Sequence, residues 1–450
     1  MRKIQRNSLF YRGLYVLMKL AFKQFFRQTE VRGLENIPTG VPLILAPNHQ
    51  SGLVDPLVVL FNRSFHPIVF MARADIFKNK LAAAFLRFLK IMPVFRIRDG
   101  YENLGKNEIQ FNEAKDVLLD SKTLCLMPEG NHGNQHKIRP LVKGLFRIAL
   151  SAEEELQGKT HVRIVPVGID HSHFQHAGSD VVLSFGKSIA VEEYLPVYKE
   201  NPANGLNILR AELADRLSLL MHDIRSEERY DLIYKLCCLG TPAWLEVQSE
   251  KDRKPTSRLK AGLFYDARKA LGMKLDELDK INSPLFNEWQ SLCINLDKLP
   301  GYPDEVATWM EYKSHFFKTV FSLVLTLPFI PGMLLNTPAW LICRHFCRKI
   351  ADKQMHNTFA FAVGFIVNPL FYITAGILVG VYMNYTWTLT IALIGLIGCY
   401  GILSERWRQE LRLPFRRFRY AFGKRKTVVR NCRTDYFWLK KSIMNWLKTS

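Results

Sequence analysis

A histidine and an aspartate six positions apart, His49 and Asp55, have the residue types and spacing best suited to chemistry in this 450-residue chain. The apolar residues 41–47 predict a buried strand that ends just before His49. Six residues turn a helix by about 600°, so the two side chains could not meet on one continuous helix, but they could meet across a turn. A carboxylate that holds one imidazole nitrogen leaves the other nitrogen to take a proton from an alcohol. His49 and Asp55 are therefore predicted to be a general base and its orienting partner.

The same stretch has a simpler interpretation. Asp55 is followed by Pro56 and by the apolar residues LVVLF, which is typical of an N-cap, a proline at the first helical position and the first turn of a helix. Asp55 would then only cap a helix, and His49 would be a polar loop residue. Capping and catalysis are compatible.

Two further blocks supply candidates for binding an anion. IMPVFRIRDG, residues 91–100, places Arg96 and Arg98 two positions apart, so both could point the same way from an extended strand. LMPEGNHGNQHKIRPLVKG, residues 126–144, places Glu129 and Gly130 after a strand and Lys143 before a helix. Guanidinium groups bind phosphate bidentately, so Arg96 is the first choice for a substrate phosphate. No GxSxG pattern is present, which indicates that the reacting alcohol belongs to the substrate.

Short apolar runs alternate with helical patterns, such as 76–90 and 106–120, from Glu30 to about Leu195. Strands separated by crossover helices predict an α/β fold, with a mainly parallel sheet flanked by helices. RIVPVGID, residues 163–170, is predicted to be a strand that ends at a Pro-Val-Gly turn. Functional residues of such sheets collect beyond the carboxyl ends of the strands. His49, Arg96, Glu129 and Asp170 all follow predicted strands, and we expect them to share one cleft.

The charge is strongly basic and unevenly distributed. The formal net charge is +21, and 48% of the residues are hydrophobic. Residues 404–450 hold 14 Lys/Arg and 3 Asp/Glu, and residues 1–29 hold seven basic residues and no acidic one. Basic residues beside long apolar segments favour anionic lipid as the partner, with nucleic acid as the weaker alternative. No nucleic-acid partner is predicted.

Four apolar segments bear on the membrane. Residues 9–26 place basic side chains along one helical face, which predicts a helix in the membrane interface; its apolar face could equally pack on the domain behind it. Residues 358–383 and 386–403 are long enough to span, and they read as a tight hairpin with basic residues at both ends, so both ends should face the cytoplasm. Prolines and a glycine split residues 316–343 near the middle, which predicts a re-entrant or interfacial helical hairpin.

Neither cysteines nor clustered histidines predict a metal site. The eight cysteines show no CxxC pair and are interpreted as reduced and structural. Cys343, His345 and Cys347 lack a second ligand pair, and HSHFQH, residues 171–176, lacks accompanying ligands and is interpreted as a surface loop.

The four blocks, in this order and at these separations, resemble the glycerol-phosphate acyltransferase family, also called phospholipid/glycerol or lysophosphatidate acyltransferases. The resemblance covers roughly residues 30–200. It implies that His49 deprotonates a glycerol hydroxyl, that Asp55 orients His49, and that Arg96, Glu129 and Gly130 serve the phosphate-bearing acceptor. We add Arg98, Lys143 and Asn48, the neighbour of the histidine, to the predicted substrate-binding residues.

This chain departs from the family pattern in two places. Five residues, QSGLV, separate the histidine from the aspartate where many members have four; some branches, including fungal-type glycerol-3-phosphate acyltransferases, also have five, and Gly52 could absorb the extra residue. The third block commonly reads Glu-Gly-Thr-Arg, but here Asn131 and His132 follow Gly130. His132 could donate to phosphate or be a simple loop histidine. Without the usual arginine, phosphate binding would depend more on Arg96, Arg98, Lys137, Arg139 or Lys143. The C-terminal apolar segments look loosely similar to the fungal-type enzymes.

The resemblance and the patterns together predict five regions. These are an amphipathic membrane-interface helix (1–29), an acyltransferase α/β domain (30–200), a helical region and linker (201–312), a re-entrant or interfacial hairpin plus a transmembrane hairpin (313–404), and a basic cytoplasmic tail (405–450).

The predicted function is that of a membrane-bound O-acyltransferase of phospholipid biosynthesis, with its catalytic domain on the cytoplasmic face. It would transfer a fatty acyl group to the hydroxyl of 1-acylglycerol-3-phosphate, with glycerol-3-phosphate as the alternative acceptor. The donor would be a thioester of coenzyme A or of acyl carrier protein, used as a co-substrate with no cofactor and no metal. Partners would be the acyl donor, the phosphate-bearing glycerolipid acceptor and membrane lipids. A catalytically silent lipid-binding scaffold is the alternative from another class, favoured only by the missing arginine.

Overall fold

The structure is a computed structural model, and its chain falls into two compact units. One unit comprises Met1–Met221 and Asp352–Thr358, and the other comprises His222–Ala351 and Phe359–Ser450. The residues described are 4–5, 8–63, 67–95, 104–174, 178–248, 261–299, 301–311, 316–350, 352, 354–411, 415 and 426–449. Arg96 and Arg98 therefore lie outside the described residues.

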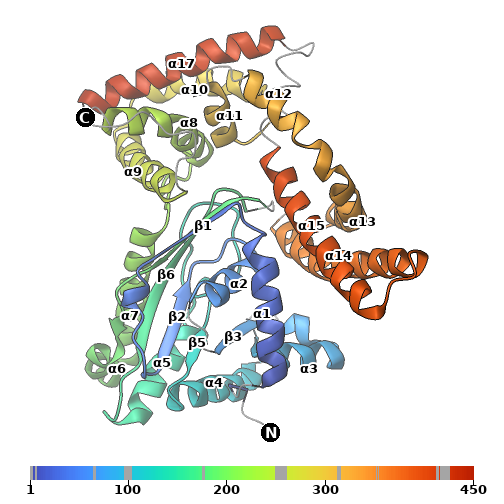
Figure 1. Ribbon diagram of the computed structural model, residues 1–450. Helices are drawn as coiled ribbons and strands as arrows, with labels where there is room; N and C mark the ends of the chain where they lie inside the picture. Colours follow the sequence, from blue (N-terminus) through green and yellow to red (C-terminus); the bar gives the residue numbers. More distant parts are fainter. Residues whose placement is uncertain are drawn as a thin grey trace. The chain divides into compact units, whose positions relative to one another are not determined.

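An eight-stranded sheet forms the centre of the first unit (Figure 1). Its strand order is β1-β7-β6-β2-β5-β3-β4, with β8 beside β6. All pairs are parallel except β6 with β7 and β6 with β8. The prediction of an α/β fold with a mainly parallel sheet is confirmed. The strands are β1 (Gln28–Arg32), β2 (Leu43–Pro47), β3 (Ile68–Arg73), β4 (Ile91–Val94), β5 (Thr123–Cys125), β6 (Arg163–His171), β7 (Asp180–Phe185) and β8 (Ile189–Ala190).

Helices cover both faces of this sheet (Figure 1). They are α1 (Leu9–Lys23), α2 (Val54–Phe61), α3 (Lys80–Phe88), α4 (Leu104–Leu119), α5 (Gly144–Leu156), α6 (Leu195–Glu200) and α7 (Pro202–Leu220), with short 3₁₀ turns η1 (Leu34–Asn36), η2 (Ala74–Phe77) and η5 (Val191–Tyr194). Three starts have clear side-chain caps: the Ser8 hydroxyl accepts from Tyr11 N, the Asn79 side chain accepts from Leu81 N and Ala82 N, and the Asn201 side chain accepts from Ala203 N and Asn204 N. The predicted helical stretches 76–90 and 106–120 correspond to η2 with α3 and to α4.

Alternate strand residues divide between the two faces because side chains of a strand point to opposite sides. Ile44 and Ala46 of β2 belong to one buried cluster with apolar residues of α4, α5 and α7. Leu43 and Leu45, also buried, point to the other face, which α1 and α2 cover. Each such side chain contributes roughly 1.5–3 kcal/mol when it leaves water. Both faces of β2 are buried, which is why its sequence is an uninterrupted apolar run.

Helix α1 is apolar on two sides. Its buried side presents Tyr15 and Phe22, whose rings both lie 5.3 Å from that of Phe61 in α2. Its other side leaves Leu9, Leu17 and Leu20 more than half exposed. The helix therefore packs on the sheet domain and still offers apolar side chains outward, so both interpretations of residues 9–26 fit.

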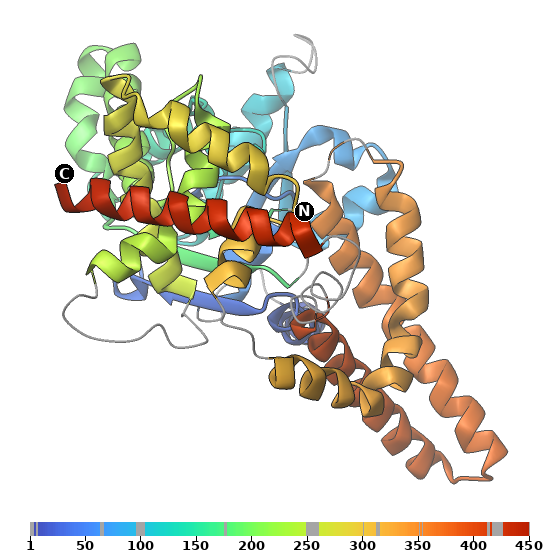
Figure 2. The ribbon, with the colours of Figure 1, turned by 90° about the horizontal axis from the view of Figure 1, so that it is seen from above.

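The second unit contains a helical cluster and a set of apolar helices. The cluster consists of α8 (Tyr230–Gln248), α9 (Ala261–Lys280), α10 (Leu285–Leu296), α11 (Pro303–Glu311) and α17 (Lys426–Thr449). Figure 2 shows α17 lying across this cluster, where Trp289 Nε1 of α10 donates to Ser442 Oγ of α17 over 3.0 Å. Tyr436 and Ile443 of α17 are fully buried. Much of the basic C-terminal stretch is thus a helix with a buried apolar face.

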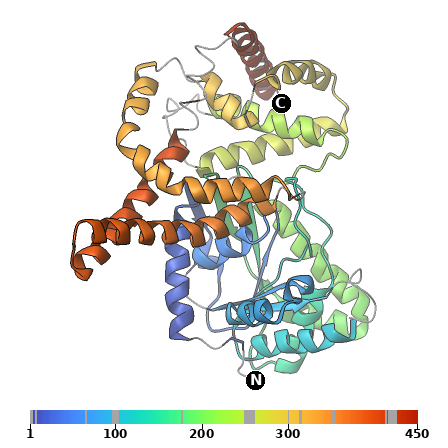
Figure 3. The same cartoon turned by 90° about the vertical axis from the view of Figure 1, so that its right-hand side faces the viewer.

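Three helices in the described part of the chain are long and apolar enough to cross a membrane: Val320–Cys347, Met355–Tyr382 and Trp387–Glu410. The first combines α12 (Phe316–Val324), η6 (Leu327–Phe329) and α13 (Ile330–Cys347), and the others are α14 (Met355–Tyr382) and α15 (Trp387–Glu410). Figure 3 shows α14 and α15 side by side, joined by a turn in which Asn384 has a positive φ, as the sequence predicted. The first of these helices is interrupted at the prolines, where the sequence predicted a break. Its re-entrant path stays a prediction.

The end of β2 is tied to β6 by one side chain. Asn48 follows Pro47, and its Nδ2 donates to Ile169 O over 2.9 Å while its Oδ1 accepts from Ile169 N at 2.6 Å. The residue is fully buried. The amide thus continues the β2–β6 ladder past a proline, which has no N–H, and it holds the start of the following loop.

We expect Asn48→Ala to lower the free energy of unfolding by about 2–4 kcal/mol, because both backbone groups of Ile169 would lose a buried partner. Asn62→Ala is the matched control: its Nδ2 also donates to a backbone carbonyl, that of Val58 at 2.8 Å, but it is only partly buried. The free energy of unfolding of this control variant should fall by less than about 1 kcal/mol. Denaturant unfolding of the detergent-purified chain measures both, and equal losses would contradict the role given to Asn48.

Candidate active site

The carboxyl ends of five parallel strands meet at one edge of the sheet, and the chemically useful side chains collect there. His49 follows β2, Arg73 ends β3, Glu129 follows β5 and His171 ends β6. The predicted turn at Pro-Val-Gly is wrong, because β6 runs straight through these residues to His171. Asp170 therefore lies inside the strand, where its carboxylate is 3.5 Å from Nδ1 of His136.

Asp55 is the centre of the site and is completely buried. Its Oδ2 accepts from Nδ1 of His49 at 2.9 Å and from the backbone N–H groups of Gln50 and Ser51, both at 2.7 Å. Its Oδ1 accepts from Nε2 of His171 at 2.7 Å. His49 and Asp55 thus meet across the turn, as the spacing predicted.

Asp55 is not the N-cap of α2, so that expectation is wrong. The helix begins at Val54, and Asp55 is its second residue. The carboxylate turns back to the loop before the helix instead of bonding amides of the first turn. The loop 49–51 is therefore wrapped around the carboxylate.

The hydrogen bonds decide the charge of Asp55. Burial alone would raise the pKa of its carboxyl, but the hydrogen bonds and charges of His171 and His49 outweigh burial and hold the pKa well below its usual range. An ionised carboxylate carries no hydrogen, so the ring nitrogens that face it must be the donors. The other nitrogen of His49, Nε2, is then the one available to accept a proton.

His171 is the residue that the sequence interpretation missed. HSHFQH was expected to be a surface loop, yet His171 is fully buried at the end of β6. Its ring lies 5.8 Å from that of Phe26 and 6.3 Å from that of Phe174. The available signal was its place directly after the predicted strand 163–170, since side chains at the carboxyl ends of parallel strands collect at one edge of the sheet.

Glu129 and Arg139 shape the loop beneath His49. Arg139 donates through Nε to the buried Glu129 carboxylate at 3.0 Å and through Nη2 to His49 O at 3.2 Å. Burial raises the pKa of Glu129, although the charge of Arg139 opposes this shift. Gly130 next to it has φ +68°, which favours glycine. Arg139 is thereby committed to holding the loop, which argues against its alternative role on phosphate.

His132 lies beside His49 and is paired with a carboxylate far along the chain. The two imidazole rings are edge-to-face with centroids 5.6 Å apart. Nε2 of His132 lies 2.6 Å from Oδ2 of Asp352. His132 is therefore a structured part of the site rather than a simple loop histidine.

A cavity of about 1640 Å³ opens over these residues. His49, Glu129, Gly130, His132 and Asp352 line one part of it. Apolar side chains of α1, α2, α3 and β4 and of the residue after α3 also line it, including Leu14, Met18, Leu57, Leu60, Leu86, Leu89, Ile91 and Val94. This volume exceeds that of a typical small-ligand pocket and would hold a long apolar chain together with a polar group.

Four basic side chains also line this cavity: Arg73, Lys143, Arg147 and Arg210. Lys143 was predicted for phosphate, whereas Arg73 at the end of β3 was missed. Arg73 donates through Nε to Asp75 at 3.2 Å. Asn48 was predicted to bind substrate, but its buried amide is engaged with Ile169, so the geometry favours a positioning role.

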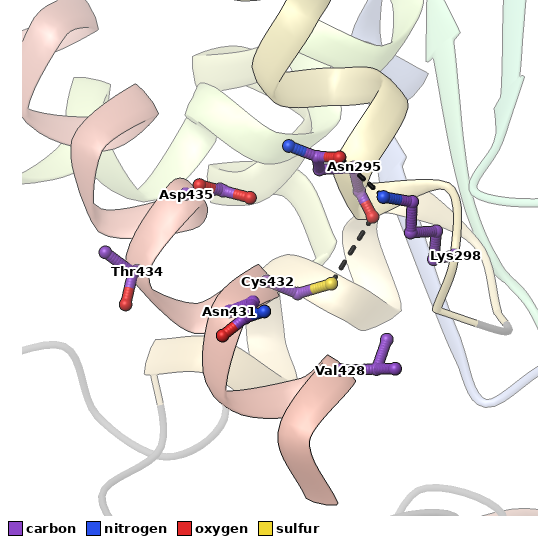
Figure 4. Close-up of a pocket in the computed structure, with 7 residues that line it drawn as sticks. All are labelled: Asn295, Lys298, Val428, Asn431, Cys432, Thr434 and Asp435. Carbon is purple, nitrogen blue, oxygen red and sulfur yellow. Dashed lines mark hydrogen bonds between the residues drawn. The ribbon is translucent and has the colours of Figure 1, made fainter. Parts of the chain in front are cut away.

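A second cavity, of about 420 Å³, lies in the helical cluster between α10 and α17 (Figure 4). There Lys298 Nζ donates to Asn295 Oδ1 over 2.7 Å, and the Cys432 thiol donates to Asn295 O over 3.3 Å. These groups satisfy one another, and none of them resembles the base-and-carboxylate arrangement at the sheet edge.

One group of potential metal ligands within the first unit has an evident structural role. Glu153, His161 and Glu192 offer atoms within 4.8 Å of one another. Glu153 accepts from Val162 N and bonds His161, and Glu192 pairs with Arg163. We infer no metal chemistry from this group.

Comparisons with known proteins find similarity over parts of this chain. A model of the family described as Acyltransferase matches residues 28–170. "Glycerol-3-phosphate O-acyltransferase 2" of Saccharomyces cerevisiae is 22% identical over 290 residues, which cover 60% of this chain and 38% of that protein. The chain thus matches less than two fifths of the length of this relative. The solved 1-acyl-sn-glycerophosphate (LPA) acyltransferase, PlsC, of Thermotoga maritima is similar with 23% identity and a TM-score of 0.32, over 45% of this chain and 80% of that one.

We expect His171→Leu to lower the free energy of unfolding by about 2–4 kcal/mol, because a buried, ionised oxygen of Asp55 would lose its donor. His171→Gln, whose amide can still donate, should recover part of this loss. His161→Leu removes a similar histidine–carboxylate bond, 2.6 Å long, from a side chain that is 39% exposed, and it should cost less than about 1 kcal/mol. Denaturant unfolding at neutral pH compares the three variants, and a His171→Leu loss no larger than that of His161→Leu would refute the account of Asp55.

Proposed function

We propose that this chain transfers an acyl group from a thioester to a hydroxyl of a glycerol phosphate, because residues 28–170 match the model of the Acyltransferase family. All four sequence blocks that predicted an acyltransferase lie within the matched residues. The observation that carries the proposed reaction is the contact of His49 Nδ1 with the buried carboxylate of Asp55 at 2.9 Å.

The proposed reaction uses His49 as base and then as acid. Nε2 of His49 takes the proton of the acceptor hydroxyl as its oxygen bonds to the thioester carbonyl carbon. Asp55 stabilises the imidazolium that forms and holds the ring in place. When the carbon–sulfur bond breaks, His49 returns the proton to the leaving thiolate. The products are an ester and a free thiol, with no cofactor or metal required.

The lining of the cavity offers both apolar and basic side chains to the substrates. Its apolar part, between α1, α2, α3 and β4, suits the acyl chain, because burial of methylene groups is favourable. Its basic side chains, among them Lys143, suit a phosphate. We propose that the acyl chain and the acceptor phosphate occupy these two parts, with the reacting hydroxyl between them at His49. Coenzyme A and acyl carrier protein are both compatible donors.

Two acceptors fit this arrangement. The name of the yeast relative favours glycerol-3-phosphate, and we place it first, whereas the sequence patterns favoured 1-acylglycerol-3-phosphate. The size of the cavity keeps 1-acylglycerol-3-phosphate as the second candidate, because a second acyl chain could also be buried there.

We propose that the reaction takes place at a membrane surface, on its cytoplasmic side. The three apolar helices are long enough to span a bilayer. On the sheet domain, the outward apolar residues of α1 adjoin α3, where Phe88 lies 5.5 Å from Phe10 and Leu81 is exposed. Such a surface lets an acyl chain pass from the bilayer into the cavity lined by the same two helices.

We expect His49→Ala to lower the rate of acyl transfer by about 10²–10⁴-fold, because the general base would be lost. The detergent-purified chain is incubated with acyl-coenzyme A and either glycerol-3-phosphate or 1-acylglycerol-3-phosphate, and release of free thiol is measured. The acceptor that gives the higher kcat/KM identifies the substrate.

His161→Ala provides the control, since His161 also bonds a carboxylate but does not line the cavity. Its rate should match that of the parent chain. An unchanged rate in His49→Ala would refute the mechanism. Binding of anionic lipid without turnover by the parent chain, with either donor, would favour the scaffold.

A further inference from the structure

A short segment from the apolar part of the sequence belongs to the sheet unit. Residues Asp352–Thr358 follow α13 and include the first four residues of α14, yet they pack with the first unit. Thr358 Oγ1 accepts from Leu53 N at 3.0 Å, and Asn357 Nδ2 donates to Phe174 O over 2.7 Å. Gly52 sits so close to Thr358 that a Cβ there would lie 2.7 Å from its hydroxyl. The segment is thus docked on the loop that joins His49 to Asp55.

The carboxylate of Asp352 reaches the reacting end of the cavity. Its Oδ2 takes the hydrogen bond of His132 Nε2 at 2.6 Å, and its Oδ1 accepts from Gln354 N at 3.1 Å. His132 is in turn in edge contact with His49. Burial would raise the pKa of Asp352, but the bonds from His132 and Gln354 and the charges of His132 and Arg73 together lower it. Asp352 is therefore an anion held at the site by cationic and N–H groups.

The groups that hold the carboxylate of Asp352 are of the kind that also bind a phosphate. A phosphate accepts hydrogen bonds from N–H groups and is attracted by guanidinium charge. The separation of 5.6 Å between the rings of His132 and His49 is short enough for the three-carbon backbone of glycerol to span. A phosphate bound at His132 would thus place a glycerol hydroxyl near the base.

We propose that the acceptor phosphate binds at His132 by displacing the carboxylate of Asp352, which makes Asp352 an internal competitor that sets the affinity for phosphate-bearing acceptors. The inference rests on the proposed function for the identity of the acceptor. The physical cause is like charge: both anions use the Nε2–H of His132, and they cannot occupy the same place.

Binding of phosphate would change only part of the docked segment 352–358. Asp352 leaves His132 when phosphate binds, whereas the contacts of Asn357 and Thr358 do not depend on His132. The segment therefore stays attached to the His49–Asp55 loop while its acidic end moves. Asp352 is a specificity-determining residue, and it takes no part in proton transfer.

The test removes the charge of Asp352 from the full-length, detergent-purified chain. Asp352→Asn should lower the KM for glycerol-3-phosphate about 2- to 5-fold and leave kcat nearly unchanged, as expected for loss of one partly exposed competing ion pair. The inorganic phosphate concentration that gives half of the maximal thermal stabilisation should fall by a similar factor. Asp352→Ser, which keeps an oxygen acceptor for Gln354 N, should behave alike and guards against a folding defect in the first variant.

Glu35→Gln is the control for a general change of charge, because Glu35 is exposed and does not line the cavity. It should leave both quantities unchanged. A KM that rises or stays the same in both Asp352 variants would overturn the inference, since Asp352 would then orient His132 or have no influence on phosphate. If the parent chain acylates neither acceptor, the proposed function fails, and the titration with inorganic phosphate still decides the competition at Asp352.

Discussion

The buried charge of Asp55 is the constraint on which the rest of the site depends. An ionised carboxylate away from water is costly unless it is fully hydrogen-bonded. The donors come from the loop after β2, through His49, Gln50 and Ser51, and from the end of β6, through His171. Asn48 locks those two strand ends together. The loop that carries His49 is therefore held in place by its hydrogen bonds to the carboxylate of Asp55.

Both apolar and basic side chains line the cavity around this centre. The arrangement follows from parallel β-structure, in which both faces are covered and only the carboxyl edge is open to substrate. Helices α1, α2 and α3 supply apolar walls, whereas the edge itself supplies Arg73, Lys143 and the histidines. The lining of one cavity thus combines apolar side chains with basic ones and with His49. The exposed apolar face of α1 extends the apolar wall to the surface of the unit.

The parts that local sequence could predict are those that local physics determines. Buried parallel strands read as apolar runs, and β2, β4 and β6, together with the turn that joins His49 to Asp55, were predicted from such runs. The short strands β1 and β8 were missed, since Gln28–Arg32 has no apolar run. His171 was missed because its burial depends on Phe26 and Phe174 rather than on its neighbours in sequence. The contact of Asp352 with His132 and that of Arg139 with His49 could not be predicted either, since they join residues 220 and 90 positions apart. Asp55 does not cap α2 as expected, because its carboxylate accepts hydrogen bonds from the preceding loop instead.

The spacing along the chain of the groups around Asp55 has a consequence for when the site forms. Asp55 and His171 are 116 residues apart, and Asn48 and Ile169 are 121 apart. Contacts that close such long loops are slow to form and come late in folding. A nascent chain that has already made β2, α2 and β5 would still lack the donor for Oδ1 of Asp55 until β6 pairs with β2. The matched family region ends at residue 170, one position before that donor. A fragment cut at this boundary would contain both His49 and Asp55 and yet leave the carboxylate half satisfied.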